Sequence, residues 1–409
     1  MRRTCSAVSA SCVAIALWIG LWATADAQPP IRIGASLSQS GAYAALSQNQ
    51  VGRGYPLCLK HTNEQGGVLG RKLELVLEDD QSQPSTAARI YEKLITQDKV
   101  DFVLGPYGSP MTATVAEVVE KHRMPMVANA ATTSLFKKGR RFIFMVPPPG
   151  EVFLEGLIDM AAKKGLKTVA VIHEDTLFAT TAAQGAVELA RKKGLEVVLV
   201  QSYSKGTADF TGLLTKVRAA TPDVLAAGSY LEDAVAITRQ LRELNVNPKM
   251  YGVTIGGAQP KFYEALGRIA EFVYGNSAWE PELVTLRAGG LIPVARQYPG
   301  AREFVEAHKK EYPGADLSYT TAAGYGGCQV LMEAVKRAGS LDREKVRDAI
   351  LKLDFNTVYG PFKVDPDGLQ IGHKMLTLQW QDGKKVIVWP DELAPGKPRF
   401  PTPPWNQRQ

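Results

Sequence analysis

Two loops of small and hydroxyl-bearing residues hold the chemistry that this sequence offers. The first runs over residues 105–112 (Gly-Pro-Tyr-Gly-Ser-Pro-Met-Thr), with Ser109 at the cap of the helix expected to follow. A serine there offers a hydroxyl group and the positive helix end to an anion, although an ordinary N-cap needs the same residue. The loop lacks both the G-x-S-x-G pattern that exposes a nucleophile and the Gly-Lys-Ser/Thr of a phosphate loop. We therefore expect no catalysis here; the residue types alone favour an ordinary N-cap, with anion binding as the alternative.

The second loop covers residues 128–134 (Ala-Asn-Ala-Ala-Thr-Thr-Ser) and follows an expected strand. Its small side chains at Ala130 and Ala131 let backbone N–H groups approach a bound group, and Thr132 adds a hydroxyl. A tight turn that needs small side chains is the structural alternative. The five histidines show no metal-ligand spacing, so we expect neither a metal nor a cofactor.

The N-terminus indicates export. Arg2 and Arg3 precede an apolar run over residues 13–22, and Ala25-Asp26-Ala27 supplies a small-residue cleavage site. The run is shorter than the roughly 20 residues that a membrane span needs, so we assign 1–27 as a signal peptide. Its removal changes the formal net charge from +7 to +6 by loss of two arginines and one aspartate. The remaining positive charge is not clustered, and we expect no nucleic-acid partner.

Cys58 and Cys328 are the two cysteines of the mature chain, on two expected helices. An oxidising compartment permits a disulfide between them. Two buried thiols are the alternative, and we favour it because buried cysteine packs as a small apolar residue.

The sequence alternates strands with amphipathic helices, which predicts an α/β fold with parallel sheets covered on both faces. About 380 mature residues exceed the size of a single core, so two domains are expected. Ligands of such folds bind where strands end and loops enter helices. The expected strands are Ile31–Ala35, Leu73–Glu78, Phe102–Gly105, Pro125–Ala128, Thr168–His173, Glu196–Tyr203, Val224–Ala227, Met250–Thr254 and Phe272–Asn276.

Residues 62–80 (TNEQGGVLGRKLELVLEDD) indicate a helix end, a glycine turn and a strand, behind the opening strand and small-residue loop of Ile31–Gly41. Together these segments resemble the branched-chain amino-acid type of periplasmic binding protein, the solute receptors of ABC importers. The resemblance spans nearly all of the mature chain. It implies the type I fold, in which two Rossmann-like parallel-sheet lobes are joined by a hinge of three crossings.

The lobe boundaries are expected at a proline-rich stretch, 146–150, and near 275–281 and 356–360. The N-terminal lobe then comprises 28–148 plus 278–356, and the C-terminal lobe comprises 149–277 plus 357–389. A proline-rich tail, 390–409, is expected to lie extended along the surface.

The resemblance also implies binding roles. Ser109 matches the serine that accepts a ligand carboxylate, and Ala130, Ala131 and Thr132 match the loop that supplies backbone groups and a hydroxyl. Phe178 and Tyr230 match two aromatic residues of the second lobe. The acid that pairs with a ligand ammonium in the amino-acid binders is matched by the uncharged Thr254.

A buried ammonium without its counter-charge costs several kcal/mol, so a plain amino acid is disfavoured unless Glu280 or Asp175 serves instead. With Tyr107, Tyr43 and Trp279 also near expected strand ends, we favour an aromatic carboxylic acid of the benzoate or phenylpropanoid type. Short amides or urea come second and branched-chain amino acids third. The resemblance implies a periplasmic, monomeric protein that partners an ABC permease; a sensor that presents its closed form to a membrane receptor is the alternative.

Overall fold

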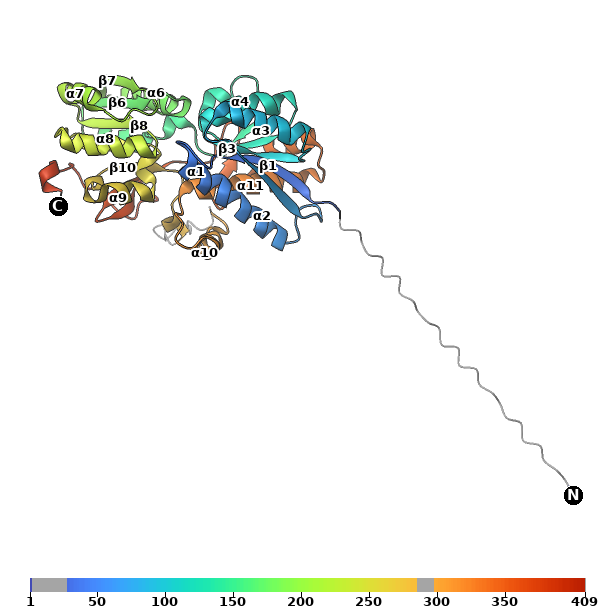
Figure 1. The fold of residues 1–409 in the computed structure, drawn as a ribbon. Coiled ribbons are helices and arrows are strands. Elements are labelled where there is room, and N and C mark those ends of the chain that lie inside the picture. Colours follow the sequence, from blue (N-terminus) through green and yellow to red (C-terminus); the bar gives the residue numbers. More distant parts are fainter. Residues whose placement is uncertain (2–27, 285–297, 409) are drawn as a thin grey trace.

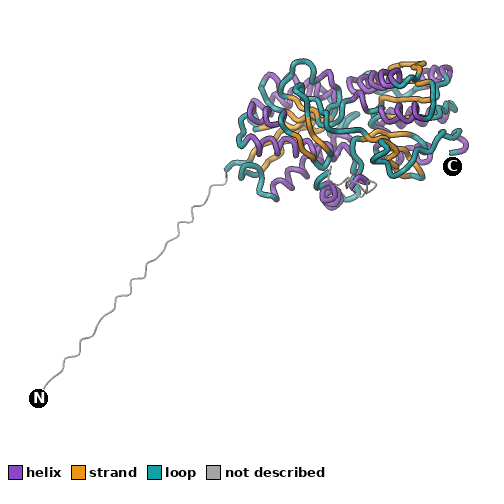
Figure 2. Tube along the Cα trace, turned by 180° about the vertical axis from the view of Figure 1, so that it is seen from behind, coloured by secondary structure: helices purple, strands orange, loops and turns teal. Residues whose placement is uncertain are grey.

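The computed structural model describes residues 1, 28–284 and 298–408. The predicted signal peptide lies outside the described residues except for Met1. Two lobes stand side by side in Figure 1, each with a β-sheet between layers of helices, and Figure 2 shows the same layering from behind. In the described part of the chain no helix is long and apolar enough to cross a membrane.

The first lobe contains a five-stranded parallel sheet of order β2-β1-β3-β4-β5. Its strands are β1 (Ile31–Leu37), β2 (Leu73–Asp79), β3 (Phe102–Tyr107), β4 (Met126–Asn129) and β5 (Ile143–Met145). One face is covered by α3 and α4, and the other by α1, the π-helical turn η1, α2 and α11, with α12 packed against α11. These helices are α1 (Ala44–Asn49), η1 (Gln50–Gly54), α2 (Tyr55–Glu64), α3 (Pro84–Thr96), α4 (Ser109–Lys121), α11 (Tyr319–Ala338) and α12 (Arg343–Leu351).

The second lobe contains a seven-stranded sheet of order β14-β13-β10-β9-β8-β6-β7. Its strands are β6 (Thr168–Glu174), β7 (Glu196–Tyr203), β8 (Val224–Gly228), β9 (Met250–Val253), β10 (Tyr274–Ser277), β13 (Leu376–Gln381) and β14 (Lys384–Trp389). The strands β6 to β10 run parallel and repeat the strand order of the first lobe. The strands β13 and β14 add an antiparallel hairpin beside β10. The predicted α/β fold with two parallel-sheet lobes is confirmed.

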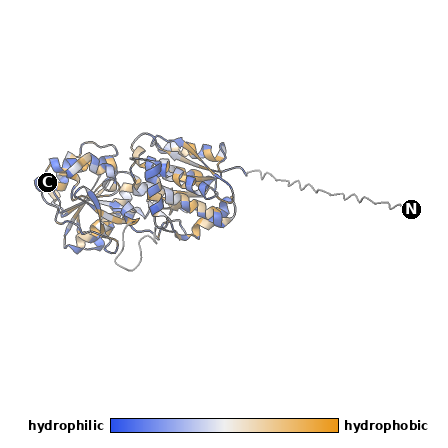
Figure 3. Cartoon of the chain, turned by 90° about the horizontal axis from the view of Figure 1, so that it is seen from below, coloured by the Kyte–Doolittle hydropathy of each residue, from blue (hydrophilic) through white to orange (hydrophobic). Residues whose placement is uncertain are grey.

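Side-chain alternation explains why helices cover both faces of the second sheet. Along β8, Val224 and Ala226 pack in the core under α5 and α6, while Leu225 and Ala227 pack under α7, α8 and α9. The outer helices carry both apolar and polar residues in Figure 3, as amphipathic helices do. Their bounds are α5 (Glu155–Lys163), α6 (Leu177–Lys192), α7 (Thr211–Ala220), α8 (Leu231–Glu243) and α9 (Pro260–Leu266).

The remaining elements are short or connect the lobes. The hairpin of β11 (Asp354–Asn356) and β12 (Pro361–Lys363) precedes the last return to the second lobe, and α10 (Ala301–Glu311) packs near α11. The 3-10 turns are η2 (Thr133–Leu135), η3 (Gly150–Val152), η4 (Gly256–Ala258), η5 (Gly267–Ala270), η6 (Pro281–Val284) and η8 (Trp405–Gln407).

The third crossing between the lobes occurs later than the sequence-based boundary at residue 357. The backbone N–H of Met145 donates to the Gly368 carbonyl at 2.8 Å, and the Gln370 amide donates to the Val146 carbonyl at 3.1 Å. The segment up to residue 370 therefore hydrogen-bonds to the edge of the first sheet at β5, and the chain returns to the second lobe between β12 and β13.

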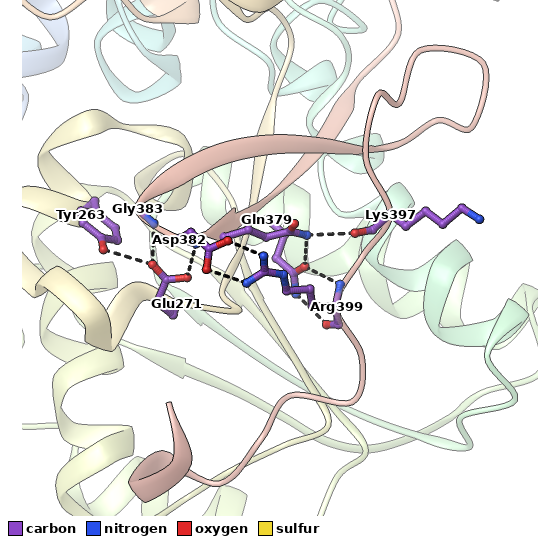
Figure 4. Close-up of polar contacts among 8 residues, drawn as sticks. Tyr263, Glu271, Gln379, Asp382, Gly383, Lys397 and Arg399 are labelled. Atoms are coloured by element: carbon purple, nitrogen blue, oxygen red, sulfur yellow. Dashed lines mark hydrogen bonds and ion pairs between the residues drawn. The ribbon is translucent and has the colours of Figure 1, made fainter. Parts of the chain in front are cut away.

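The tail beyond β14 is fixed to the second lobe. Gln379 and Arg399 exchange two hydrogen bonds of 3.0 and 2.8 Å, as Figure 4 shows. Farther along, the Trp405 indole N–H donates to the Val246 carbonyl at 2.8 Å. Because its side chains bond back to the lobe, the tail packs as part of it.

The prediction of two free thiols was wrong. Cys58 on α2 and Cys328 on α11 form a disulfide in the first lobe. The sequence could not bring the two together, because they lie 270 residues apart and only the packing of α2 against α11 makes them neighbours.

Candidate functional site

A narrow cavity lies between the two lobes. The first lobe and its returning segments contribute polar and aromatic side chains, and the second lobe contributes mainly apolar ones. The lining residues are Gln50, Tyr107, Gly108, Ser109, Asn129, Ala131, Pro147, Phe153, Phe178, Tyr230, Ile255, Tyr319, Thr320, Ala323 and Tyr359.

The strand order explains why the cavity lies here. In each sheet the chain order reverses between two neighbouring strands, β1 and β3 in one lobe and β6 and β8 in the other. Loops that leave such strands go to opposite faces of the sheet and leave a crevice at their carboxyl ends. Tyr43 and Tyr107 follow the first pair of strands, and Phe178 and Tyr230 follow the second. These four aromatic residues, two from each lobe, thus lie near one another across the lobes.

Ser109 lies at one end of the cavity. Its Oγ accepts a hydrogen bond from the Thr132 backbone N–H at 3.2 Å. The N-cap of α4 is Gly108, with φ of 80°, so Ser109 is the first helical residue and not the cap expected from the sequence. The hydroxyl stands at the positive end of a 13-residue helix, where an anion is favoured.

The neighbouring loop contributes unequally. Ala131 lines the cavity, and its carbonyl accepts a hydrogen bond from the Gly150 N–H at 2.6 Å. Ala130 and Thr132 are buried beside it without lining the cavity. The Thr132 hydroxyl has no hydrogen-bond partner among the described residues. A free donor therefore stands directly behind the Ser109 end.

The opposite wall is aromatic. The rings of Phe153 and Phe178 meet edge to face with centroids 4.9 Å apart, and those of Phe178 and Tyr230 with centroids 5.9 Å apart. Tyr43 lies 5.9 Å from Tyr107 and 5.5 Å from Tyr230, ring centroid to ring centroid. An aromatic ring of a ligand could pack against these rings in the same edge-to-face geometry. Tyr43 itself lies outside the main cavity and packs behind its wall.

Three polar lining residues were not predicted as contacts: Gln50, Asn129 and Thr320. The amides of Gln50 and Asn129 both donate to the Tyr55 hydroxyl at 3.3 Å. The Asn129 Oδ1 atom is buried without a partner among the described residues, and the Thr320 hydroxyl bonds to that of Ser318 at 2.7 Å. The cavity thus offers neutral donors and acceptors on the side of the first lobe.

Close helix contact positions Gln50 and Thr320. A Cβ at Gly324 of α11 would lie 2.2 Å from the Gln50 carbonyl, and a Cβ at Gly54 would lie 2.7 Å from the Thr321 carbonyl. Only glycine permits this approach of α11 to the π-helical turn η1. In the sequence, the glycine-rich run Gly324-Tyr-Gly-Gly indicates that another segment approaches this helix closely, but it does not tell which segment that is.

The other lining residues that the sequence analysis missed come from loops and from the returning segments. Pro147 lies in the proline-rich first crossing, Phe153 follows it, and Ile255 follows Thr254 directly, so these three had a local signal. The remaining ones depend on tertiary packing; they are Tyr319, Ala323 and Tyr359.

Thr254 and Trp279 lie outside the cavity lining. The Thr254 hydroxyl donates to the Ser229 carbonyl at 2.7 Å and accepts from the Ser229 N–H at 2.9 Å, so it joins the ends of β8 and β9. Trp279 is fully buried, and its ring centroid lies 5.8 Å from that of Phe304. Both residues lie behind the walls and do not line the cavity.

Neither acid considered as a substitute partner for an ammonium lines the cavity. Glu280 is buried and accepts a hydrogen bond from Lys385. Asp175 is exposed, and its carboxylate accepts the Lys205 backbone N–H at 3.1 Å. No acidic side chain is among the described residues that line the cavity.

A second cavity lies on the other side of Tyr230 and Tyr43. Glu174 and Asp233 line it. Burial, with the Asp233 charge as the next cause, raises the pKa of Glu174 to about 7, and burial raises the pKa of Asp233 to about 6. Among the described residues no cluster of His, Cys, Asp or Glu could hold a metal ion.

Two parallel-sheet lobes that enclose a cavity at their strand ends define a two-lobed ligand-binding protein. A family model described as periplasmic binding protein matches residues 30–385. The chain belongs to the periplasmic binding protein family, and its general function is solute binding.

Individual relatives agree with this assignment. The chain is 28% identical over 407 residues to Leu/Ile/Val-binding protein homolog 7 of Brucella melitensis biotype 1, with 95% of this chain and 98% of the relative covered. The leucine-binding protein LivK of Thermotoga maritima superposes with a TM-score of 0.76 at 25% identity, over 87% of this chain and 97% of that one. LivJ of Streptococcus pneumoniae, solved with isoleucine, has a similar fold with a TM-score of 0.75 at 23% identity, over 87% and 97%.

Proposed function

We propose that the protein is the periplasmic substrate-binding component of an ABC importer and captures a small aromatic carboxylic acid of the benzoate or phenylpropanoid type. One observation carries the ligand class: the cavity combines the anion-favouring Ser109 end with aromatic rings on both lobes, and none of its described lining residues is an acid.

The carboxylate would lie at the N-terminus of α4. The Ser109 hydroxyl, the backbone at Ala131 and the helix end supply donors and positive potential without a full ion pair. The aromatic ring of the ligand would then lie between Tyr107 on one lobe and Phe178 with Tyr230 on the other. Both parts of such a ligand meet matching chemistry.

Branched-chain amino acids are the second candidate, because the relatives carry Leu/Ile/Val-binding names. Such a ligand would bury an ammonium group. The ammonium would lose its hydration shell on burial, and no carboxylate in the cavity would compensate for this loss. The cost is several kcal/mol. The lining residues of the cavity therefore favour a ligand without an amine, and a neutral amide head that bonds to Gln50 or Asn129 is a further outcome of the test.

The mechanism is a population shift between open and closed forms. The first lobe binds the carboxylate through Ser109, and closure brings Phe178 and Tyr230 onto the ring. The closed monomer then presents a surface that joins both lobes to the permease. A sensor would present the same closed surface to a membrane receptor. Transport assays with the permease distinguish the transport role from the sensor role.

The test is a thermal-shift screen of refolded protein that lacks residues 1–27. Benzoate and 3-phenylpropanoate are compared with leucine, valine, acetamide and urea, since a ligand bound only by the native state raises the melting temperature. A shift with the aromatic acids alone supports the proposal. A shift with leucine or valine alone overturns the ligand class and leaves the transport role.

A further inference from the structure

Lys205 connects the two lobes beside the ligand cavity. Its ammonium lies 4.0 Å from the centroid of the Tyr43 ring. Lys205 follows β7 of the second lobe, whereas Tyr43 follows β1 of the first. A cation at this distance over a ring face is attracted by the quadrupole of the ring. The contact therefore exists only while the lobes are together.

Tyr43 is not an isolated ring. It is almost fully buried and packs against Tyr107 of its own lobe and Tyr230 of the other. Both of those tyrosines line the ligand cavity. A contact that fixes the Tyr43 ring therefore also supports Tyr107 and Tyr230, the two cavity-lining rings that it packs against.

The surroundings of Lys205 favour a cation at this place. The second cavity is lined by Glu174 and Asp233, and the Asp233 Oδ1 atom and the Tyr230 hydroxyl are buried there without a partner among the described residues. Lys205 makes no ion pair within 4.0 Å with any acid in the described ranges. Its backbone is anchored by the bond to Asp175, so the side chain is held at the rim of the cavity by a fixed loop.

We propose that Lys205 is a positioning residue for ligand retention: its ammonium caps Tyr43 across the cleft, holds that ring against Tyr230 and stabilises the closed form. Lys205 does not touch the ligand. It acts through Tyr43, and its loss lets the lobes separate more often. The predicted effect on ligand retention rests on the proposed function. The effect of the contact on lobe closure can be tested without a ligand.

The experiment measures lobe closure directly. Exposed Lys137 of the first lobe and Lys192 of the second are changed to cysteine and labelled with dyes for energy transfer. Cys58 and Cys328 form a disulfide, so neither of them reacts with the dyes. The closed-to-open ratio is compared for Lys205 and for Lys205→Met. We expect the variant to lower the ratio about two- to fivefold, the effect of an exposed cation–π contact, while the melting temperature without ligand stays the same.

Four further variants make the result specific. Lys205→Arg keeps a cation and should restore the ratio. Lys216→Met removes an exposed lysine of the same lobe whose ammonium bonds to Gln201, and should leave it unchanged. Tyr43→Leu should lower the ratio, and adding Lys205→Met to it should lower it no further. An unchanged ratio in Lys205→Met, or an additive double variant, overturns the proposal.

The ligand arm uses 3-phenylpropanoate. If wild type binds it, Lys205→Met should raise the dissociation rate by the same factor and leave the association rate unchanged. If wild type does not bind it, the proposed ligand class fails while the energy-transfer measurement still decides the role of Lys205. An equal dissociation rate in wild type and variant contradicts the proposed role in retention.

Discussion

The carboxylate of Glu280 accepts a hydrogen bond from the ammonium of Lys385, and both side chains are almost completely buried. Glu280 follows β10 at the second crossing between the lobes, whereas Lys385 lies on β14 of the second lobe. Lys385 also donates to the Ala258 carbonyl at 3.2 Å. Burial raises the pKa of Glu280 although the Lys385 charge opposes this. The pair ties the crossing to the second sheet and removes Glu280 from ligand chemistry.

Breaking this pair should destabilise the protein strongly. Glu280→Gln or Lys385→Met leaves one buried charge uncompensated, and we expect the free energy of unfolding to fall by about 3–5 kcal/mol. Denaturant titration of each variant measures the change. The double variant Glu280→Leu/Lys385→Met, which buries no charge, should recover much of the loss. A double variant that is as unstable as the worse single one would contradict this account.

Ser109→Ala should weaken the binding of an aromatic carboxylate. A charge-assisted hydrogen bond is worth about 1.5–3 kcal/mol, so the dissociation constant should rise about tenfold or more. Calorimetry with benzoate and with benzamide makes the comparison, and the neutral amide should lose less. Ser134→Ala, at an exposed serine of the nearby loop, is the control and should bind as wild type does. Equal losses for acid and amide would place the carboxylate elsewhere.

The sequence predicted the parts of the fold that local patterns determine. All nine expected strands occur, and the turn at Gly66-Gly67 has φ values of 100° and 83°, as a glycine pair allows. β5 and the β11–β12 hairpin were missed because runs of three residues carry almost no periodic signal.

The candidate site was predictable where a residue lies at the end of a strand or within four residues after it. Ser109, Tyr107, Phe178 and Tyr230 all line the cavity, since the strand ends that carry them meet there. Tyr359 was not predictable, because it comes from a late segment whose return to the first lobe is a tertiary contact. A local sequence pattern does not show which distant segments of the chain lie side by side in the fold.

Thr254 illustrates a second limit of the sequence. The family resemblance suggested a specificity role for this residue, which follows β9, but its hydroxyl makes two hydrogen bonds to the backbone of Ser229. A charged replacement such as Thr254→Glu would break both bonds before any effect on the ligand.

Thr254→Val is therefore the sharper experiment. It keeps the shape of the side chain and removes both hydrogen bonds, so the free energy of unfolding should fall by about 1–3 kcal/mol. Because Ser229 precedes Tyr230, the loss should also weaken binding of the aromatic ring, while Thr254→Ser should restore both stability and affinity. Denaturant titration and calorimetry measure the two quantities. A Val variant with unchanged stability would show that these bonds contribute little.

The pH dependence of stability should reveal Glu174. Burial and the nearby Asp233 charge raise the pKa of Glu174 from 4.5 to about 7 in the folded protein. Between these pH values the folded state holds a proton that the unfolded chain has released, so stability decreases as pH rises through this window. Above about pH 7 the full cost of the buried charge remains, and at pH 4.5 and below it is absent.

Glu174→Gln removes this titration and should stabilise the protein at pH 8 relative to wild type, with little difference at pH 4.5. Urea unfolding at pH 4.5, 6 and 8 gives the two curves, which should diverge as pH rises. Glu188→Gln, at an acid on α6 outside the residues that line the second cavity, is the matched control and should run parallel to wild type. The Asp233 carboxyl titrates in an overlapping range, and its charge acts on Glu174. The difference between the curves therefore measures Glu174 together with its coupling to Asp233. Parallel curves for wild type and Glu174→Gln would mean that the Glu174 carboxylate is hydrated in the native state.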